Sequence, residues 1–565
     1  MKQLLTVLGY KLWAAMKGVF GFRRSEVTRE VASFLVLAGF SVAIFFFARF
    51  ITSYLINEAH IGLFLFHRFL SMVLFVFFLA VNLGNMIVAY STLYKSDEVD
   101  FLLSQPISFE KVFIIKFLDN FFRRSTTLFL VGTSVLAGYG SVFGMHWTFY
   151  LFVMAGLVIP FMLLAATLAV IILLVLMKLA ITVNVRRLIA GLLLGYFASV
   201  YLYFRVTNPE QLTEEVMKFY PNVNEYFSQF DPKLITYLPN HWLADSLYFL
   251  VRGDFSAAVP YVEVMVLTTI ASVIVCLLVA IRLYYFTWLA SRELRIQKAS
   301  NKSQPAPRFD FQRSSSFRPQ TEVLLKKEFW QFFREPSQWL HLLVMFFLIV
   351  VFVGSVATIH LKTTNPLHQS VSYLVTMSFN GFLIASIALR FVFPAMSLEG
   401  QSFWSIRSAP IRLRKIYTLK FFPLFACVLL VAELLSFFSN YSLHEQTQLF
   451  LVTAGGSLSL SIGLVALNLG AGSYFANYRE KSAIRVASSH GASVTFLLSL
   501  GFLTFLLLVL FLLLPFRHLL SQTVILGRVY SEIPLSLALS IMFGISILIA
   551  GIASYLGLRS LERDF

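Results

Sequence analysis

Long apolar runs separated by short polar segments recur along the whole chain. A helix needs about 20 apolar residues to cross a hydrocarbon core of about 30 Å. Twelve runs meet this requirement, with approximate limits 31–56, 69–93, 125–143, 148–176, 188–206, 260–287, 338–360, 370–393, 421–440, 448–475, 492–514 and 534–557. The pattern therefore predicts an all-α polytopic membrane protein with about 12 transmembrane helices.

A polar stretch divides these runs into two groups of six. Residues 297–320 (QKASNKSQPAPRFDFQRSSSFRPQ) are rich in Ser, Pro, Gln and basic residues and show no apolar periodicity, which is typical of a flexible linker. Six spans on each side give both halves the same orientation, so we expect two parallel six-helix repeats. The predicted domains are a first half, 1–296, the linker, 297–320, and a second half, 321–565.

One short polar phrase occurs in both halves, between the second and third spans. SQPISFEKVFIIKF (104–117) is matched 304 residues later by SAPIRLRKIYTLKF (408–421), with six identical positions. In each copy a proline ends any preceding helix, and apolar residues follow it at helical spacing. We expect each copy to be a short amphipathic helix at the membrane surface. The alternative is an ordinary loop that lysines hold to anionic headgroups.

Basic residues are concentrated in the segments that share one side of the predicted membrane. With the amino terminus inside, the cytoplasmic segments hold 34 of the 45 Lys and Arg residues. Segment 288–337 holds ten of them, whereas 207–259 holds three against seven acidic residues. By the positive-inside rule both termini are cytoplasmic and 207–259 is an external insertion. The formal charge of +17 then needs no nucleic-acid partner.

The motifs of common enzyme and metal sites are missing from the sequence. It contains no G-x-x-x-x-G-K-[ST] phosphate loop. His444 and Glu445 lack the second histidine that a zinc site would require. Cys276 and Cys427 both fall inside predicted spans, which argues against a disulfide. We therefore expect no catalytic residue, no metal site and no nucleotide site in this chain.

Ionisable residues inside predicted spans are candidates for a functional role. Arg282 and Arg390 lie near cytoplasmic ends, where long side chains can reach the headgroups. Arg49 and Glu433 remain, both in the outer half of the membrane. One interpretation is a buried pair that joins the two halves, and the other is that each meets water in a translocation cavity.

Three segments of the second half resemble a family of ATP-binding-cassette exporter permeases of the type-2 class. They are LLKKEFWQFFREPSQW (324–339), FPAMSLEGQSFWSIRSAPI (393–411) and LGAGSYFANYREKSAIRVASSHGA (469–492), and they follow the family's order. The first half matches more weakly, through DEVDFLLSQPIS (97–108). The chain departs from the family pattern at Glu335, where the family has Asp, and at 481–484, where a proline turn is missing.

This resemblance implies a surface helix before each half (1–28 and 321–337), a coupling segment between the second and third spans, and external insertions at 207–259 and 516–533. It implies a multi-pass permease subunit of an exporter in the cell (inner) membrane, moving a lipid-like, peptide or drug-like substrate. Separate cytoplasmic ATPase subunits, expected in two copies, would bind ATP and Mg²⁺, and membrane lipids would be the other partners. The expected ATPase-coupling residues are Pro106, Phe109, Lys111, Val112, Phe113, Pro410, Leu413, Arg414, Lys415, Ile416 and Tyr417.

Two other functions stay open at this point. An ion-coupled secondary transporter can also have six plus six spans in parallel halves, although it should carry more ionisable residues near the midplane. A membrane scaffold or enzyme subunit without a transport role is the third possibility.

Overall fold

A computed structural model of the chain describes residues 9–10, 24–58, 62–183, 185–207, 235–300, 319–334, 338, 342, 345–353, 366–443, 447–480, 483–487, 489–513 and 535–563. All regular elements in these ranges are helices. The chain forms two compact units, Met1–Phe309 and Asp310–Phe565. The predicted linker lies mostly outside the described residues, so the predicted domain boundaries stay a prediction.

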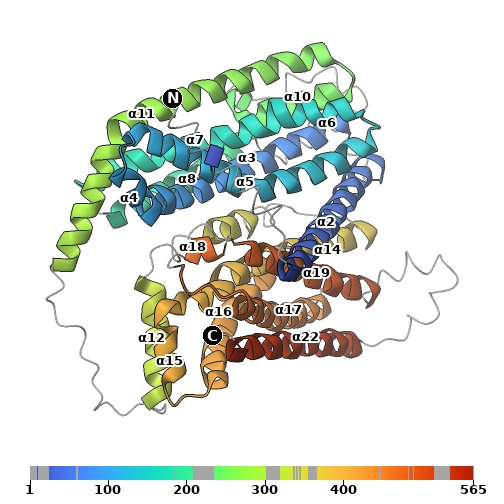
Figure 1. Ribbon diagram of the computed structural model, residues 1–565. Coiled ribbons are helices and arrows are strands. Elements are labelled where there is room, and N and C mark those ends of the chain that lie inside the picture. The colour runs from blue at the N-terminus through green and yellow to red at the C-terminus, as the bar shows by residue number, and fades with distance from the viewer. Residues whose placement is uncertain are drawn as a thin grey trace. The chain divides into compact units, whose positions relative to one another are not determined.

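Unit 1 is a bundle of long helices with several short helical elements between them (Figure 1). Its helices are α2 (Arg24–Ser53), η1 (Tyr54–Glu58), α3 (Leu63–Tyr94), α4 (Asp97–Ser104), α5 (Phe109–Val142), α6 (Trp147–Val153), η2 (Met154–Val158), α7 (Ile159–Leu179), α8 (Val185–Thr207), η4 (Ile235–Tyr237), α10 (Pro239–Val251) and α11 (Phe255–Ser300). The bundle's main core gathers aromatic and aliphatic side chains such as Phe161, Trp242 and Met265, from α7, α10 and α11.

Unit 2 is likewise helical, and several short helices precede the turn at Pro410. Its helices are α12 (Pro319–Arg334), α14 (Pro366–Ile387), η6 (Ala388–Val392), η7 (Phe393–Ala395), η8 (Ser397–Ser402), α15 (Phe403–Ser408), α16 (Leu413–Leu443), α17 (Thr447–Tyr474), α18 (Ala483–Val486), α19 (His490–Leu513) and α22 (Leu535–Arg563). Gly400 sits at the kink inside η8 with φ +62°, a conformation that glycine adopts without strain.

Ten of the described helices are long and apolar enough to cross a membrane, which confirms a polytopic membrane protein. Of the two other predicted spans, 125–143 corresponds to a shorter apolar stretch, Leu128–Val142. The other, 338–360, lies mostly outside the described residues, as do most of the 1–28 surface helix and the whole 516–533 insertion. The twelve-span count and the two-repeat architecture therefore stay predictions.

Helix α10 was not predicted, and the local sequence explains where it begins and ends. Pro239 occupies its first turn, where proline's fixed φ fits and its missing N–H costs nothing. After α10 the chain turns at Gly253, whose φ is +80°. Asp254 then accepts a hydrogen bond from the backbone N–H of Ala257 at 3.2 Å, which caps the start of α11.

Helices α17 and α22 pack with their backbones in close contact around Gly470. A Cβ atom at this position would lie 2.3 Å from the carbonyl oxygen of Ala553. A Cβ atom on Gly557 would lie 2.7 Å from the Cα of Gly470. Small residues commonly allow such close approach between membrane helices.

We expect Gly470→Val to destabilise unit 2 by about 1–3 kcal/mol, because the added side chain must push the two backbones apart. Thermal unfolding of the purified chain in detergent measures the effect. Gly551→Ala is the matched control on α22, since nothing lies within 4 Å of a Cβ atom there. Equal midpoints for the two variants would show that the close contact contributes nothing.

Candidate functional site

The two copies of the repeated phrase adopt the same backbone turn. In each, a short helix (α4 or α15) ends just before the proline, and a long helix (α5 or α16) begins three residues after it. The N–H of Ile107 donates to the carbonyl of Gln105 at 2.6 Å, and that of Ile411 donates to the carbonyl of Ala409 at 2.7 Å. Each proline is thus the centre of a three-residue γ-turn, which suits its fixed φ. We call residues 97–117 and 397–421 the first and second proline turns.

The helix that follows each proline is not the separate short surface helix that the sequence predicted. It is the first part of a long helix, of 34 residues in α5 and 31 residues in α16. The short helix in each turn lies before the proline instead. A displacement of the turn would therefore act directly on a long membrane helix.

Four of the predicted coupling residues are buried inside their own units. Val112 and Phe113 are 0% and 2% exposed, and Ile416 and Tyr417 are 4% and 3% exposed. The Tyr417 hydroxyl donates to the Oγ of Ser554 in α22 at 3.3 Å. In this arrangement these side chains attach each turn to its own unit, and a partner could not contact them. The coupling role of the two segments itself stays a prediction.

The other predicted coupling residues lie on or near the surface of the turns. Phe109 is half-buried, with its ring centroid 4.5 Å from that of Tyr285 in α11. Lys415 donates from Nζ to Oε1 of Gln320 at 3.2 Å. Lys111 and Leu413 are half-buried, and the remaining three are exposed: Pro106, Pro410 and Arg414.

Each short helix before a proline exposes one large aromatic side chain. Phe101 in α4 is 63% exposed, and Trp404 in α15 is 66% exposed. The sequence did not single out either residue, because its pattern predicted the helix after the proline. Aromatic side chains are enriched among the residues that carry the energy of protein interfaces, so these two are the turns' best candidates for contact with a partner.

A buried lysine joins the two helices of the first proline turn, α4 and α5. Lys116 of α5 is 4% exposed, and its Nζ lies 2.5 Å from Oε2 of Glu98 in α4. A second ion pair joins Asp100 of α4 to Arg292 of α11. The short helix is therefore fixed to two long helices by charged contacts.

A buried lysine occupies the equivalent position in the second proline turn, 304 residues later. The Nζ of Lys420 lies 2.6 Å from Oε1 of Glu399 and 2.7 Å from Oε2 of Glu328 in α12. Lys420 and Glu399 side chains are both 1% exposed, and Lys327 pairs with Glu399 from α12. The amide of Gln331 also donates to the carbonyl of Leu398 at 2.8 Å. This cluster fixes α12 to η8 and α16.

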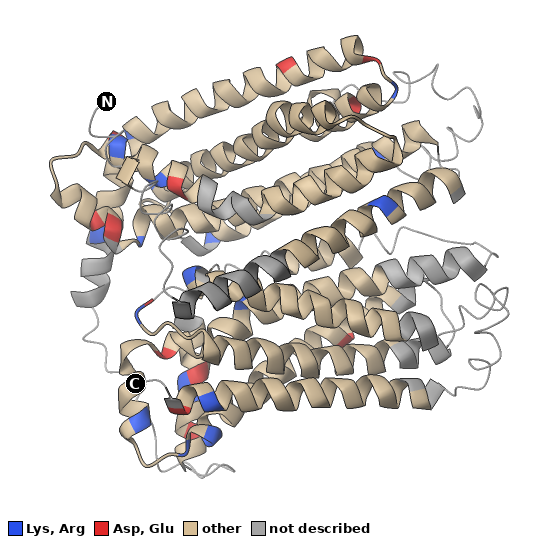
Figure 2. Ribbon diagram, turned by 45° about the vertical axis from the view of Figure 1, so that its right-hand side comes forward, with Lys and Arg blue, Asp and Glu red and all other residues tan. Residues whose placement is uncertain are grey.

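In each unit, many of the Lys, Arg, Asp and Glu positions that the ribbon marks in colour gather toward one end of the helices (Figure 2). The two intramembrane candidates are exceptions. Arg49 in α2 is exposed on unit 1, and Glu433 in α16 is half-buried on unit 2. Glu433 accepts a hydrogen bond from the Oγ of Ser457 in α17 at 2.9 Å. The predicted pair between Arg49 and Glu433 would join the two units, and it stays a prediction.

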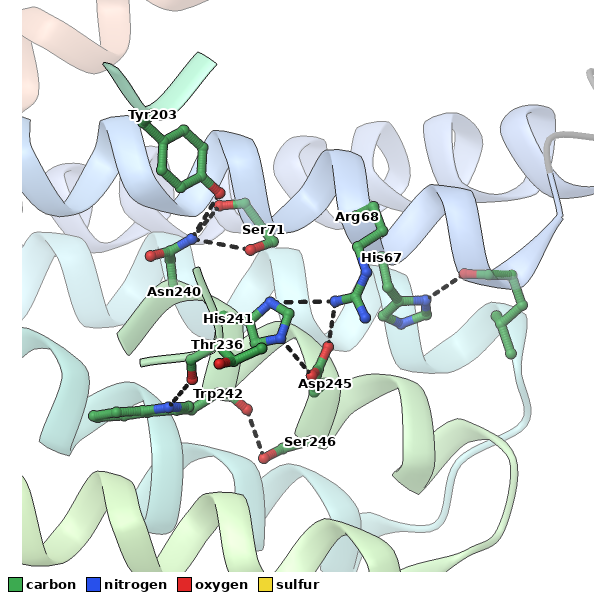
Figure 3. A network of polar contacts seen from close by, with 11 residues as sticks. His67, Arg68, Ser71, Tyr203, Thr236, Asn240, His241, Trp242, Asp245 and Ser246 are labelled. Carbon is green, nitrogen blue, oxygen red and sulfur yellow. Dashed lines mark hydrogen bonds and ion pairs between the residues drawn. The ribbon is translucent and has the colours of Figure 1, made fainter. Parts of the chain in front are cut away.

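A buried ionic network near the start of α3, the end far from the first proline turn, connects α10 to α3 (Figure 3). The Nη1 of Arg68 lies 2.5 Å from Oδ1 of Asp245 and 3.3 Å from Nδ1 of His241. The Nε2 of His241 lies 3.0 Å from Oδ2 of Asp245. A neutral His241 protonated on Nε2 satisfies both contacts, because Nδ1 then accepts and Nε2–H donates.

All three members of this network are buried, so their pairing is energetically important. Arg68, His241 and Asp245 are 5%, 2% and 1% exposed. Burial by itself raises the pKa of Asp245, but the hydrogen bond from His241 and the charge of Arg68 outweigh it and hold that pKa below its usual value. The contribution of Asp245 to stability is therefore complete above the usual carboxyl range and is lost only as the pH falls through the lowered pKa.

Neutral hydrogen bonds extend the network to two more helices. The Nδ2 of Asn240 donates to the Oγ of Ser71 at 2.9 Å and to the hydroxyl of Tyr203 in α8 at 3.0 Å. The hydroxyl of Tyr139 in α5 donates to Nε2 of His67 at 2.7 Å. The sequence pattern did not predict these contacts, although the i, i+4 spacing of His241 and Asp245 after Pro239 could have indicated a helix with one polar face.

Comparison with known proteins bears on both sites. A family described as "Putative ATP-binding cassette" matches residues 24–564. The chain belongs to this family. No match was found among curated proteins or among solved structures. Family membership and the ten apolar helices together indicate a membrane component linked to ATP-binding-cassette transport.

The family match corrects one prediction from the sequence. We expected no nucleotide site in this chain and ATP hydrolysis only in a partner, because the G-x-x-x-x-G-K-[ST] loop is missing. The matched family is itself described as an ATP-binding cassette and covers nearly the whole chain, so that expectation is contradicted. ATP and Mg²⁺ binding are implied by membership, and a nucleotide site in this chain would have to use residues other than such a loop.

Proposed function

We propose that the chain is the membrane-spanning permease of an ATP-binding-cassette exporter in the cell membrane, with both proline turns on the cytoplasmic side. The strongest support is that the same local structure occurs in both units. It consists of a γ-turn at proline, a buried apolar pair after it, and a buried lysine that pairs with a glutamate. The Lys and Arg distribution supports the cytoplasmic assignment.

The proline turns can transmit motion to the membrane helices because each turn is fixed to a long helix, α5 or α16. A force applied to α4 reaches α5 through the backbone and also through the Lys116–Glu98 contact. A force applied to α15 reaches α16 through the backbone, while the Lys420–Glu399 contact fixes α16 to η8, the element just before α15. Packed interiors transmit displacement because they compress little. A lipid-like, peptide or drug-like substrate would then be moved when the helices of the two units rearrange.

We further propose that a cytoplasmic ATP-binding-cassette subunit docks on the exposed aromatic side chains of the turns. The double variant Phe101→Ala, Trp404→Ala should lose co-purification of that subunit, because a central interface aromatic typically contributes about 2 kcal/mol or more. Trp147→Ala is the matched control, since Trp147 is 65% exposed but lies at the start of α6, outside both turns. Affinity purification in mild detergent with identification of bound proteins measures the result.

Two outcomes would count against the proposal. Full retention of the subunit by a well-expressed double variant would show that the turns are not its docking site. Equal loss in the Trp147→Ala control would show a general effect of removing surface aromatics. Photo-labelling of the same preparations with an azido derivative of ATP then shows which polypeptide binds nucleotide.

A further inference from the structure

The carboxylate of Glu433 has a serine as its partner, whereas two buried carboxylates elsewhere pair with basic side chains. Asp245 and Glu399 each bind basic side chains in the same unit. Within the described part of its own unit, Glu433 forms no ion pair with Lys or Arg, and the hydroxyl of Ser457 donates to its Oε1. The side chain is half-buried, whereas Ser457 is 1% exposed. One oxygen of the carboxylate is thus held by the protein, while the residue as a whole is partly exposed.

Glu433 lies on a partly exposed apolar face of α16. Leu430 and Phe437, three residues before and four residues after it, share that face and are 60% and 49% exposed. The whole region falls within the candidate span Leu413–Ser439. The result is a single carboxylate, supported by a serine, between two large apolar side chains.

A carboxylate at this position is costly if the face contacts only lipid. Charged side chains inside spans almost always face a bundle interior or a water-filled cavity, or pair with an opposite charge. Ser457 offers a hydrogen bond but no positive charge. The charge of Glu433 would be best compensated by a cation that binds at this partly exposed face of α16.

We propose that Glu433, Ser457, Leu430 and Phe437 form a binding site for a cationic amphiphile, which is then the substrate class of the permease proposed above. The apolar body of the ligand packs against Leu430 and Phe437, and its positive group pairs with the carboxylate. Ser457 is a positioning residue that orients the carboxylate. This site rests on the proposed function only for its role in transport, not for the binding itself.

Tetraphenylphosphonium and tetraphenylborate test the site, because they have the same shape and opposite charge. The purified full chain in detergent should bind the phosphonium and not the borate, beyond what chain-free micelles take up. Glu433→Gln should weaken phosphonium binding about tenfold or more, since a charge pair is lost. Ser457→Ala should weaken it less, and Glu433→Asp should keep part of the affinity.

Glu263→Gln is the control, because Glu263 is likewise an acidic residue on a long apolar helix, α11, but is exposed, and its substitution should leave binding unchanged. Equal binding by wild type and Glu433→Gln would overturn the site. Binding by Arg49→Gln but not by wild type would also overturn it, by showing that Arg49 occupies the carboxylate. ATPase co-purification with each variant is measured in parallel, so a failure of this site is distinguished from a failure of the proposed function.

Discussion

Lys420→Met is expected to lower the free energy of unfolding of unit 2 by about 3 kcal/mol, because removing one partner from a buried ion pair leaves a buried charge uncompensated. The Lys420 and Glu399 side chains are each only 1% exposed, and their charged atoms are 2.6 Å apart. Methionine keeps most of the apolar stem of lysine and removes its ammonium group. Glu399 would keep Lys327 as a partner, so the effect lies at the low end of such losses.

Thermal unfolding of the purified chain measures this loss, and two variants make the comparison specific. Lys420→Arg keeps the positive charge and should recover part of the stability. Lys326→Met removes a 46% exposed lysine that pairs with Glu322 one helical turn away, and exposed pairs of this kind contribute about 0.5 kcal/mol. If Lys420→Met unfolds at the same temperature as Lys326→Met, the buried cluster does not stabilise the second proline turn.

The same substitution in the first proline turn should have a smaller effect. Glu98, the partner of Lys116, is 48% exposed, whereas Glu399 is 1% exposed. A half-exposed carboxylate that loses its lysine can be hydrated, so less of the desolvation penalty remains. The two equivalent lysines thus share a position but differ in their expected contribution to stability.

The length of apolar runs was sufficient to predict most of the membrane helices, and its failures have physical causes. The run 125–143 is predicted as a separate span, but it forms only the later part of α5, whose apolar stretch is Leu128–Val142. The earlier part of α5 is polar and includes Glu110, Lys111 and Lys116. Helix α10 has 13 residues, too few to span a membrane, and carries Asn240, His241 and Asp245. Its burial depends on partners in α3 and α8, which are distant in the sequence.

The candidate site shows what a repeat in one sequence can and cannot predict. The recurrence of 104–117 at 408–421 correctly indicated one local structure formed twice. Helical spacing marked Phe113 and Tyr417 as members of an apolar face, but spacing does not reveal what covers a face. Each packs inside its own unit. The lysines were recognised as identical positions, yet the partner of Lys420 in α12 lies 92 residues away along the chain.

The ionic network could not have been predicted from the sequence either, because its partners lie far apart along the chain. Arg68 and Asp245 are 177 residues apart, and Arg68 stands just before the run 69–93 that was assigned as a span. The segment 207–259 differs from its neighbours in its acidic composition, and its assignment as an external insertion stays a prediction. Composition alone, however, does not distinguish a loop from a helix that is inserted among others.

Arg68→Met is expected to cost about 3–5 kcal/mol, because Asp245 would remain buried without the guanidinium that compensates its charge. Asp245 is 1% exposed, and the nearest remaining partner is His241. The loss should weaken the attachment of α10 to α3 in particular. Labelling of Ser246→Cys by a water-soluble maleimide reports this, since Ser246 is 0% exposed in the intact unit.

The double variant Arg68→Met, Asp245→Leu separates the charge from the packing. Replacing both members of a buried ion pair with apolar residues of similar volume is often neutral or stabilising, so the double variant should unfold at a higher temperature than Arg68→Met and protect the introduced thiol again. Arg252→Met, at the exposed end of α10, should leave both measurements nearly unchanged.

If Arg68→Met already protects that thiol as well as the parent does, the ion pair does not hold α10, and the neutral hydrogen bonds from Asn240 must be sufficient. If only the double variant recovers, the charge of Asp245 makes Arg68 indispensable, and α10 is held in place by compensation of that single buried charge.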